Sequence, residues 1–202
     1  MGECMLRRVV FWLGLLVGAT AALANAKQDC VKLSGDAAIA ACDQAIRQNP
    51  KDAEAYNNRG GEYMAKRELD RAIADYNKAI ELDPKYALAY YNRGLAYRDK
   101  HDYDRTIADF NKAIELYPKF AAFYNGRAWA YFKAGKSAQG LPDAEKSLEL
   151  RPNEAYALDT RGHIFEALGR KEEAIADYRL ALSKDPSLGT SKEGLKRLGA
   201  SP

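Results

Sequence analysis

The chain has 202 residues, of which 29% are charged and 47% hydrophobic, and its formal net charge is only +3 at pH 7. No run of five like charges occurs along the sequence. This balance argues against nucleic acid as the main partner, because a protein that binds nucleic acid needs a basic stripe or patch.

The first 26 residues predict an export signal. Two arginines, at positions 7 and 8, precede the apolar run Val9–Ala24, and an A-N-A cleavage sequence overlaps its end. These are the three parts of a secretory signal peptide. As a helix the apolar run would span about 24 Å, short of the roughly 30 Å hydrocarbon core of a membrane. We therefore expect a signal peptide over residues 1–26 and a periplasmic or secreted chain that begins at Lys27 or Asn25. An uncleaved membrane anchor is the alternative.

Residues 27–52 predict a partial repeat with one complete helix over Ala37–Ile46, and Ser34 or Asp36 stands near its N-cap. A preceding helix would overlap the signal peptide. Cys30 and Cys42 are the two cysteines of this segment, and an even pair in an exported chain suggests one disulfide. Two buried free thiols are the alternative.

A period of 34 residues runs through the rest of the chain. Prolines mark it at Pro50, Pro84, Pro118, Pro152 and Pro186. Each period contains two stretches with amphipathic helical spacing, and proline near its end stops the second helix. A period of this length built from two helices predicts a helical solenoid.

Three positions of the period carry the same kind of side chain in every full repeat. The fourth is large and apolar, the eighth small and the eleventh aromatic, at Tyr56, Tyr90, Tyr124, Leu158; Gly60, Gly94, Ala128, Gly162; and Tyr63, Tyr97, Tyr131, Phe165. With these residues the chain resembles the tetratricopeptide repeat (TPR) family. The resemblance implies an all-α fold, a right-handed superhelical solenoid of antiparallel helix pairs. The predicted repeats cover residues 53–86, 87–120, 121–154 and 155–188.

The third full repeat, 121–154, departs from the pattern in its second helix. Pro142 would lie inside this helix if it began near Ala138, so we expect it to start near Leu141, with the proline in its first turn. Gly135 and Gly169 suit the ends of the first helices of the last two repeats. Residues 189–202 predict a capping helix and tail, as a solenoid end requires.

Arginine occupies the seventh position of every full repeat and aspartate the twenty-third. The four expected pairs are Arg59–Asp75, Arg93–Asp109, Arg127–Asp143 and Arg161–Asp177. The partial repeat lacks both residues. We expect each pair to join the two helices of its repeat, because the planar guanidinium can bond a carboxylate through two hydrogen bonds. The alternative is a ladder of arginines that binds a ligand, but the aspartates would neutralise it.

No catalytic or cofactor site is predicted. The two histidines, His101 and His163, have no nucleophile or metal-ligand set at usable spacing in the sequence. Neither a metal nor another cofactor is expected. We therefore expect a protein without enzymatic activity.

In proteins that the chain resembles, the first helices of the repeats line a concave groove that binds peptides or helices. The groove positions here are Asn57, Asn58, Tyr91, Asn92, Arg98, Asn125, Trp129, Phe132, Lys133, Tyr156 and His163. Some family members clamp a C-terminal carboxylate there. Asn58 and Asn92 match the asparagine of that clamp, but Ala122 and Gly126 stand where it needs basic residues, which argues against this mode.

The sequence therefore predicts an exported TPR adaptor or scaffold that binds a protein or peptide in its groove. Asparagines can bond a peptide backbone as donors and acceptors, and aromatic side chains serve as apolar anchors. One alternative is a binder of small ligands or cell-wall glycans, which would use the same groove. Another is a structural subunit of an envelope assembly. A membrane partner is expected only if the signal segment stays uncleaved.

Overall fold

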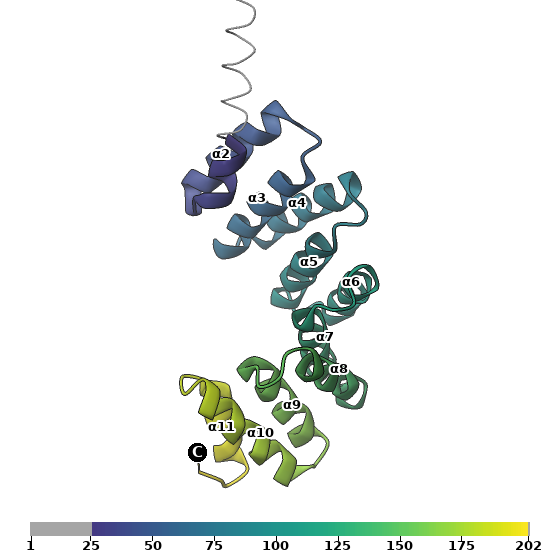
Figure 1. Ribbon diagram of the computed structural model, residues 1–202, viewed down its shortest axis with the longest axis vertical. Helices are drawn as coiled ribbons and strands as arrows, with labels where there is room; N and C mark the ends of the chain where they lie inside the picture. The colour runs from purple at the N-terminus through teal and green to yellow at the C-terminus, as the bar shows by residue number, and fades with distance from the viewer. Residues whose placement is uncertain (1–25, 202) are drawn as a thin grey trace, which may run out of the picture. The chain divides into compact units, whose positions relative to one another are not determined.

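The computed structural model describes residues 26–201, and all regular secondary structure in this range is helical (Figure 1). The helices, in chain order, are α2 (Gly35–Gln48), α3 (Ala53–Ala65), α4 (Leu69–Leu82), α5 (Ala87–Asp99), α6 (Tyr103–Leu116), α7 (Ala121–Lys133), α8 (Ser137–Leu150), α9 (Ala155–Ala167), α10 (Lys171–Lys184) and α11 (Gly189–Arg197). The predicted all-α fold of paired helices is confirmed. The described chain forms two compact units, which divide after Pro84.

The first unit contains a short helical stretch, residues 26–32, followed by α2, α3 and α4. Helix α3 packs against both α2 and α4. A small core joins Ala26, Cys30, Cys42, Ala45 and Ala55. Cys30 and Cys42 lie next to each other, with their Cα atoms 4.6 Å apart. The pair connects the short stretch to α2, where a complete repeat would have a longer first helix.

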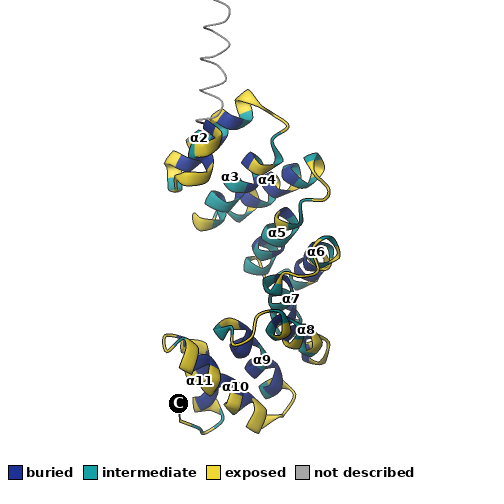
Figure 2. Cartoon of the chain, in the orientation of Figure 1, coloured by how far each residue is buried: buried dark blue, intermediate teal, exposed yellow. Residues whose placement is uncertain are grey.

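The second unit contains three helix pairs, α5–α6, α7–α8 and α9–α10, and ends with α11. Buried positions occur on every one of these helices (Figure 2). Large rings fill the space between helices: Phe110, Phe123 and Tyr178 are at most 1% exposed. The last helix, α11, packs on α9 and α10 and buries Leu195 completely. It therefore covers the apolar end of the last pair, which water would otherwise meet.

Glycine at the eighth position of a repeat allows its two helices to approach closely. A Cβ on Gly94 would lie 2.7 Å from a ring carbon of Phe110, and one on Gly162 would lie 2.7 Å from a ring carbon of Tyr178. No Cβ fits at that distance, so the ring on the second helix of these repeats requires glycine at the facing position of the first helix. The glycine of the first helix and the aromatic ring of the second therefore depend on each other.

The residue two positions after the end of each first helix has a left-handed backbone. Gly135 and Gly169 have φ values of +73° and +74°, as expected for glycines at a helix C-terminus. Arg67 and His101 take the same conformation at the corresponding places, with φ values of +63° and +62°. His101 is exposed, as expected for a residue at a helix end. The turn geometry therefore holds in all four repeats, although only two of them have the residue that adopts it without strain.

The prediction that the helix of the third full repeat starts near Leu141 is wrong. Helix α8 begins at Ser137 and carries Pro142 as its sixth residue. Packing explains this start, because Gly140 must face α7: a Cβ there would lie 2.9 Å from the Ala128 carbonyl oxygen. The proline removes one backbone hydrogen bond, to the carbonyl of residue 138, in the second turn. The close approach of α7 and α8 keeps the helix in the register of the other repeats.

The structure brings together all four predicted arginine–aspartate pairs. In each, Nε and Nη2 of the arginine donate to the two carboxylate oxygens of the aspartate, at distances between 2.6 and 2.9 Å. The aspartate side chains are only 7–10% exposed and those of the arginines 19–26%. The hydrogen bonds that each arginine donates to its aspartate raise the pKa of the arginine, so the guanidinium stays charged.

Some of these arginines also reach the repeat before their own. Nη1 of Arg59 donates to Asp43 on α2, and Nη1 of Arg127 donates to Asn111 on α6 at 2.7 Å. Each of the two therefore joins three helices: its own, the second helix of its repeat and the second helix of the preceding repeat. The sequence predicted only the contact within the repeat.

The predicted signal peptide lies almost wholly outside the described residues, which begin at Ala26. Within residues 26–201, none of the helices has the length and apolar character needed to cross a membrane.

Candidate functional site

The predicted groove residues lie at different depths on the first helices of the repeats. Asn57 and His163 are buried, at 7% exposure each, whereas Tyr156 and Lys133 are exposed. The partly exposed ones are Asn58, Tyr91, Asn92, Arg98, Asn125, Trp129 and Phe132. The structure gathers only four of the eleven at one pocket: Trp129, Phe132, Lys133 and His163.

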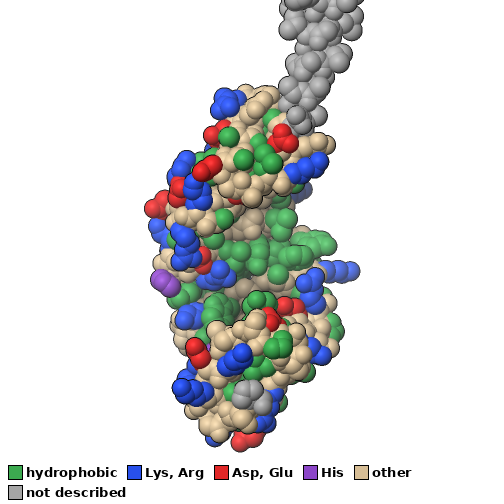
Figure 3. All heavy atoms as spheres, turned by 90° about the vertical axis from the view of Figure 1, so that its left-hand side faces the viewer, with side chains coloured by type: hydrophobic (Ala, Val, Ile, Leu, Met, Phe, Trp, Pro, Cys, Tyr) green, Lys and Arg blue, Asp and Glu red, His purple; other side chains and the backbone are tan. Residues whose placement is uncertain are grey.

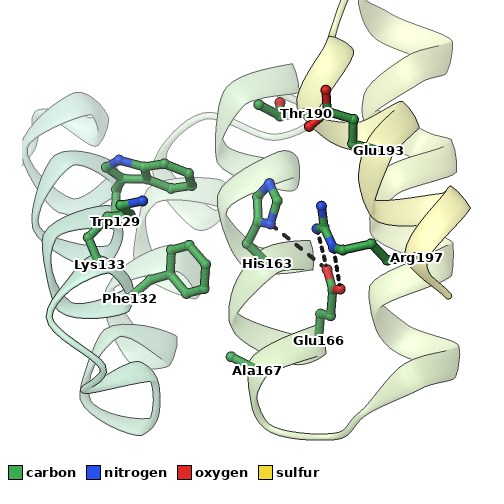
Figure 4. Close-up of a pocket in the computed structure, with 9 residues that line it drawn as sticks. All are labelled: Trp129, Phe132, Lys133, His163, Glu166, Ala167, Thr190, Glu193 and Arg197. Carbon is green, nitrogen blue, oxygen red and sulfur yellow. Dashed lines mark hydrogen bonds and ion pairs between the residues drawn. The ribbon is translucent and has the colours of Figure 1, made fainter.

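The pocket has a volume of about 480 Å³ and lies between α7, α9 and α11 (Figure 4). Helix α7 supplies Trp129, Phe132 and Lys133. The other wall comes from α9 and the capping helix α11: His163, Glu166, Ala167, Thr190, Glu193 and Arg197. The volume is large enough for one amino-acid side chain, and small-molecule sites fall in the same range.

His163 is the centre of an aromatic cluster at this pocket. Its ring lies 5.5 Å from the ring of Trp129, 5.4 Å from Phe132 and 5.1 Å from Tyr178. Nζ of Lys133 lies 5.8 Å from the centre of the Trp129 ring, within reach of a cation–π contact. The α7 wall therefore combines two aromatic faces with one exposed cation.

A chain of hydrogen bonds ties His163 to the capping helix. Arg197 donates from Nε and Nη2 to the two carboxylate oxygens of Glu166, both at 2.7 Å. The Tyr178 hydroxyl donates to Glu166 Oε2 at 2.6 Å and lies 2.9 Å from His163 Nδ1. Because the single hydroxyl proton goes to the carboxylate, Nδ1 of His163 must carry a proton and donate to Tyr178. The other ring nitrogen, Nε2, is then an acceptor.

Burial and neighbouring charges shift the pKa values of His163, Glu166 and Tyr178. Burial lowers the pKa of His163 below its usual 6.5, since it disfavours the imidazolium. The hydrogen bonds from Arg197 lower the pKa of Glu166. Burial, with the Glu166 carboxylate beside it, raises the pKa of Tyr178. At neutral pH the site therefore holds a neutral histidine, a neutral tyrosine and an ionised glutamate.

Asp159 is a second buried group of α9 that contacts the capping helix. It is 6% exposed and accepts hydrogen bonds from the hydroxyls of Ser191 and Thr190. Its Oδ2 lies 3.6 Å from His163 Nε2, too far for a hydrogen bond. Within residues 26–201, no lysine or arginine forms an ion pair with this carboxylate.

Two buried acceptors on adjacent first helices have no hydrogen-bond partner among the described residues. They are Oδ1 of Asn125 on α7 and Nε2 of His163 on α9. Asn125 stands one helical turn before Trp129, on the same face of α7. Buried polar atoms are normally satisfied, so an unpaired acceptor points to a water or ligand that supplies a donor.

The remaining predicted groove residues have other surroundings. Tyr91 lies against the rings of Phe110 and Phe123, at 5.3 and 5.0 Å, and Phe123 in turn contacts Phe120 at 4.7 Å. Figure 3 shows hydrophobic side chains gathered over α5 and α7 on the face it presents. In the first unit, Asn57 Nδ2 donates to Asn58 Oδ1 at 3.5 Å. These residues add apolar and amide surface outside the pocket.

Several residues of the pocket region were not predicted from the sequence. They are Asp159, Glu166, Thr190, Glu193 and Arg197. The carboxylates of α9 had a usable signal, because Asp159, His163 and Glu166 are spaced by four and three residues and so share one face of the helix. Thr190, Glu193 and Arg197 had none, since the capping helix lacks the residue types that mark the first helices of the repeats. Residues 26–201 contain no cluster of three or more histidine, cysteine, aspartate or glutamate side chains able to hold a metal ion.

Comparison with known families identifies the class of protein. Family models of the TPR repeat match residues 60–100, and those of the tetratricopeptide repeat match residues 87–120 and 125–188. The chain belongs to the TPR family. A search of curated proteins with the sequence finds no match.

Solved TPR structures resemble the chain over most of its length. YrrB, a TPR protein with an unusual peptide-binding site, is 25% identical with a TM-score of 0.64, covering 78% of this chain and 90% of its own. MamA is 26% identical with a TM-score of 0.67, covering 75% and 88%. The first TPR of Spaghetti (RPAP3), bound to the HSP90 peptide SRMEEVD, is 27% identical with a TM-score of 0.55, covering 58% and 93%. TPR proteins are generally scaffolds for protein interactions, and relatives of this chain bind peptides.

Proposed function

We propose that this protein is an exported TPR adaptor that binds a protein partner through the groove side of its first helices and catalyses no reaction. The observation that carries the proposal is the pocket between α7, α9 and α11. It joins two aromatic faces, Trp129 and Phe132, to the buried acceptor His163 Nε2, which lacks a donor. Aromatic anchors with a few placed polar groups are the usual composition of a peptide-binding hot spot.

Site-specific crosslinking tests this proposal. A photoreactive residue at Tyr156, which is 60% exposed at the start of α9, should capture the partner in the native compartment. The matched control is Leu180, 38% exposed on the second helix α10, which should capture nothing. Capture at Leu180 alone would favour a structural subunit that assembles through its outer helices. Capture at neither position, with glycans altering Trp129 fluorescence, would favour a glycan binder.

We also propose that the chain is exported and oxidised. The pattern of residues 1–26 and the proximity of Cys30 to Cys42 support this. N-terminal sequencing should find a mature chain that begins at Asn25 or Lys27. Thiol labelling of the denatured, non-reduced protein should find no free thiol. A product that retains the apolar run would be membrane-anchored, and two labelled cysteines in the mature chain would contradict the disulfide.

A further inference from the structure

The pocket region carries more negative than positive charge. Two carboxylates, Glu166 and Glu193, and two cations, Lys133 and Arg197, line the pocket. A third carboxylate, Asp159, lies directly behind this lining, 3.6 Å from His163 Nε2 and hydrogen-bonded to Thr190. Arg197 is bound to Glu166 through both carboxylate oxygens, so these two charges cancel locally. Asp159 and Glu193 remain against Lys133 alone. A cationic ligand group would therefore improve the charge balance, and an anionic one would worsen it.

Asp159 is the buried carboxylate of this region that lacks a positively charged neighbour among the described residues. Its side chain is 8% exposed, and its hydrogen-bond donors are the neutral hydroxyls of Ser191 and Thr190. An ionised carboxylate taken out of water is costly unless a positive charge compensates it. The histidine 3.6 Å away is neutral in the tautomer that Tyr178 imposes. The missing positive charge can therefore come from a ligand.

The α7 wall of the pocket suits a cation as well. The face of Trp129 already attracts Nζ of Lys133, and Phe132 presents a second ring beside it. Lys133 is exposed and forms no ion pair with any residue from 26 to 201, so it is free to swing away. A ligand cation can replace it over the indole ring and also reach the carboxylates of the opposite wall.

The orphaned acceptors point to the same chemistry. His163 lines the pocket and its Nε2 needs a hydrogen-bond donor, as does Oδ1 of Asn125, which lies outside the lining on α7. Ammonium and guanidinium groups offer several N–H donors and no acceptor, whereas a carboxylate offers only acceptors. A ligand carboxylate in the pocket would leave His163 Nε2 unsatisfied.

We infer that the pocket between α7, α9 and α11 binds a basic side chain, arginine or lysine, of the partner's peptide segment. This inference rests on the proposed function, since it names the chemistry of the segment that the groove accepts. The aromatic pair Trp129 and Phe132 covers the apolar stem and the delocalised charge. Glu193 and the acceptor His163 Nε2 take up the N–H donors, and Asp159 behind them balances the added positive charge.

A set of blocked nine-residue peptides tests this inference. The peptides differ only at the central residue, which is arginine, lysine, leucine or glutamate within a Gly-Ser background. The full chain carries Trp12→Phe, so that Trp129 is its only tryptophan and reports binding by fluorescence. We expect the arginine and lysine peptides to bind at least tenfold more tightly than the glutamate peptide, and more weakly as salt increases. Equal or tighter binding of the glutamate peptide would overturn the inference.

Charge reversal at two exposed positions sharpens the test without disturbing the core. Glu193→Lys should weaken the arginine peptide roughly fivefold, and Lys133→Glu should tighten it by a similar factor, because both lie at the rim. Asp159→Asn should weaken it at least tenfold. Should Asp159→Asn fail to fold, Glu193→Lys and Lys133→Glu still test whether the pocket prefers a basic side chain. Identical affinities across wild type and both rim variants would contradict a pocket for a basic side chain.

The two proposals fail in different ways. If the glutamate or leucine peptide binds best and Trp129 responds, the groove binds peptides but the assigned side chain is wrong. If no peptide alters Trp129 fluorescence, the inference fails, and crosslinking at Tyr156 decides separately whether the groove binds a protein at all.

Discussion

Two sets of polar contacts between the helices of this protein differ in completeness. Each arginine–aspartate pair makes two hydrogen bonds between a partly buried guanidinium and a buried carboxylate, and the pair recurs in all four full repeats. The network of α9, α10 and α11 occurs once. It joins His163, Tyr178, Glu166 and Arg197 but leaves His163 Nε2 without a donor and Asp159 without a cation.

The contrast separates structural polar groups from groups available to a ligand. A buried network whose members are all satisfied holds helices in one arrangement, and an arginine paired this way has little capacity left for a partner. A buried network that lacks donors is costly alone and gains when a ligand supplies them. The repeated pairs therefore belong to the scaffold, and the single network at the end of the array belongs to the candidate site.

Removing one partner of a repeated pair should have the largest effect on stability. Asp177→Ala leaves Arg161 partly buried without its carboxylate, and the free energy of unfolding should fall by about 3 kcal/mol. Adding Arg161→Leu should recover much of this loss, because no charge is then left between the helices without a partner. A double-mutant cycle by urea unfolding, compared as whole curves, measures the coupling. Additive effects would show that the two residues do not stabilise each other.

Filling the space beneath Tyr178 should have the next largest effect. A Cβ on Gly194 of α11 would lie 2.5 Å from Cζ of Tyr178, whose hydroxyl is held by Glu166 and His163. Gly194→Ala should therefore destabilise the protein by about 2 kcal/mol through overpacking. The control is Gly61→Ala in α3, where a Cβ meets no atom within 4 Å and should stabilise by roughly 0.5–1 kcal/mol. A neutral Gly194→Ala would mean that α11 packs less tightly than described.

Breaking the exposed end of the network should cost less. The side chain of Arg197 is 48% exposed, so Arg197→Ala should lower the free energy of unfolding by about 1 kcal/mol or less. Thermal unfolding of this variant beside Asp177→Ala compares the two kinds of contact directly. A loss as large as that of Asp177→Ala would contradict the distinction between scaffold pair and terminal network.

The smallest effect should be a pH dependence that comes from His163. Because burial lowers its pKa in the folded state, the unfolded chain takes up the proton first as the pH falls below about 6.5. The contribution of the neutral histidine is complete above that pH and decreases below it. Urea unfolding between pH 7.5 and 5.5 should show this decline, and His163→Gln should reduce it. Glu166 does not interfere, because its lowered pKa puts its titration below this range. A decline unchanged in His163→Gln would place its origin elsewhere.

Much of the fold follows from the repeated sequence. A 34-residue period fixes which residues face the neighbouring helix, and small residues such as Gly94 and Gly162 meet the rings that follow them by sixteen positions. The arginine–aspartate pairs were predictable for the same reason. Arginine and aspartate stand at the same two positions of all four full repeats, so a contact within one repeat recurs in all.

The tertiary structure decided what does not repeat. Close packing of Gly140 on α7 kept α8 in register despite Pro142, against the local preference of proline. The candidate pocket depends on Glu193 and Arg197 of α11 lying beside His163 and Glu166 of α9, some thirty residues earlier. Such a contact occurs once. Helix α11 begins 34 residues after α9 but lacks the residue types of the other first helices, so the repeat pattern does not predict it. Only the packing of the capping helix determines which polar atoms are satisfied and which are left for a ligand.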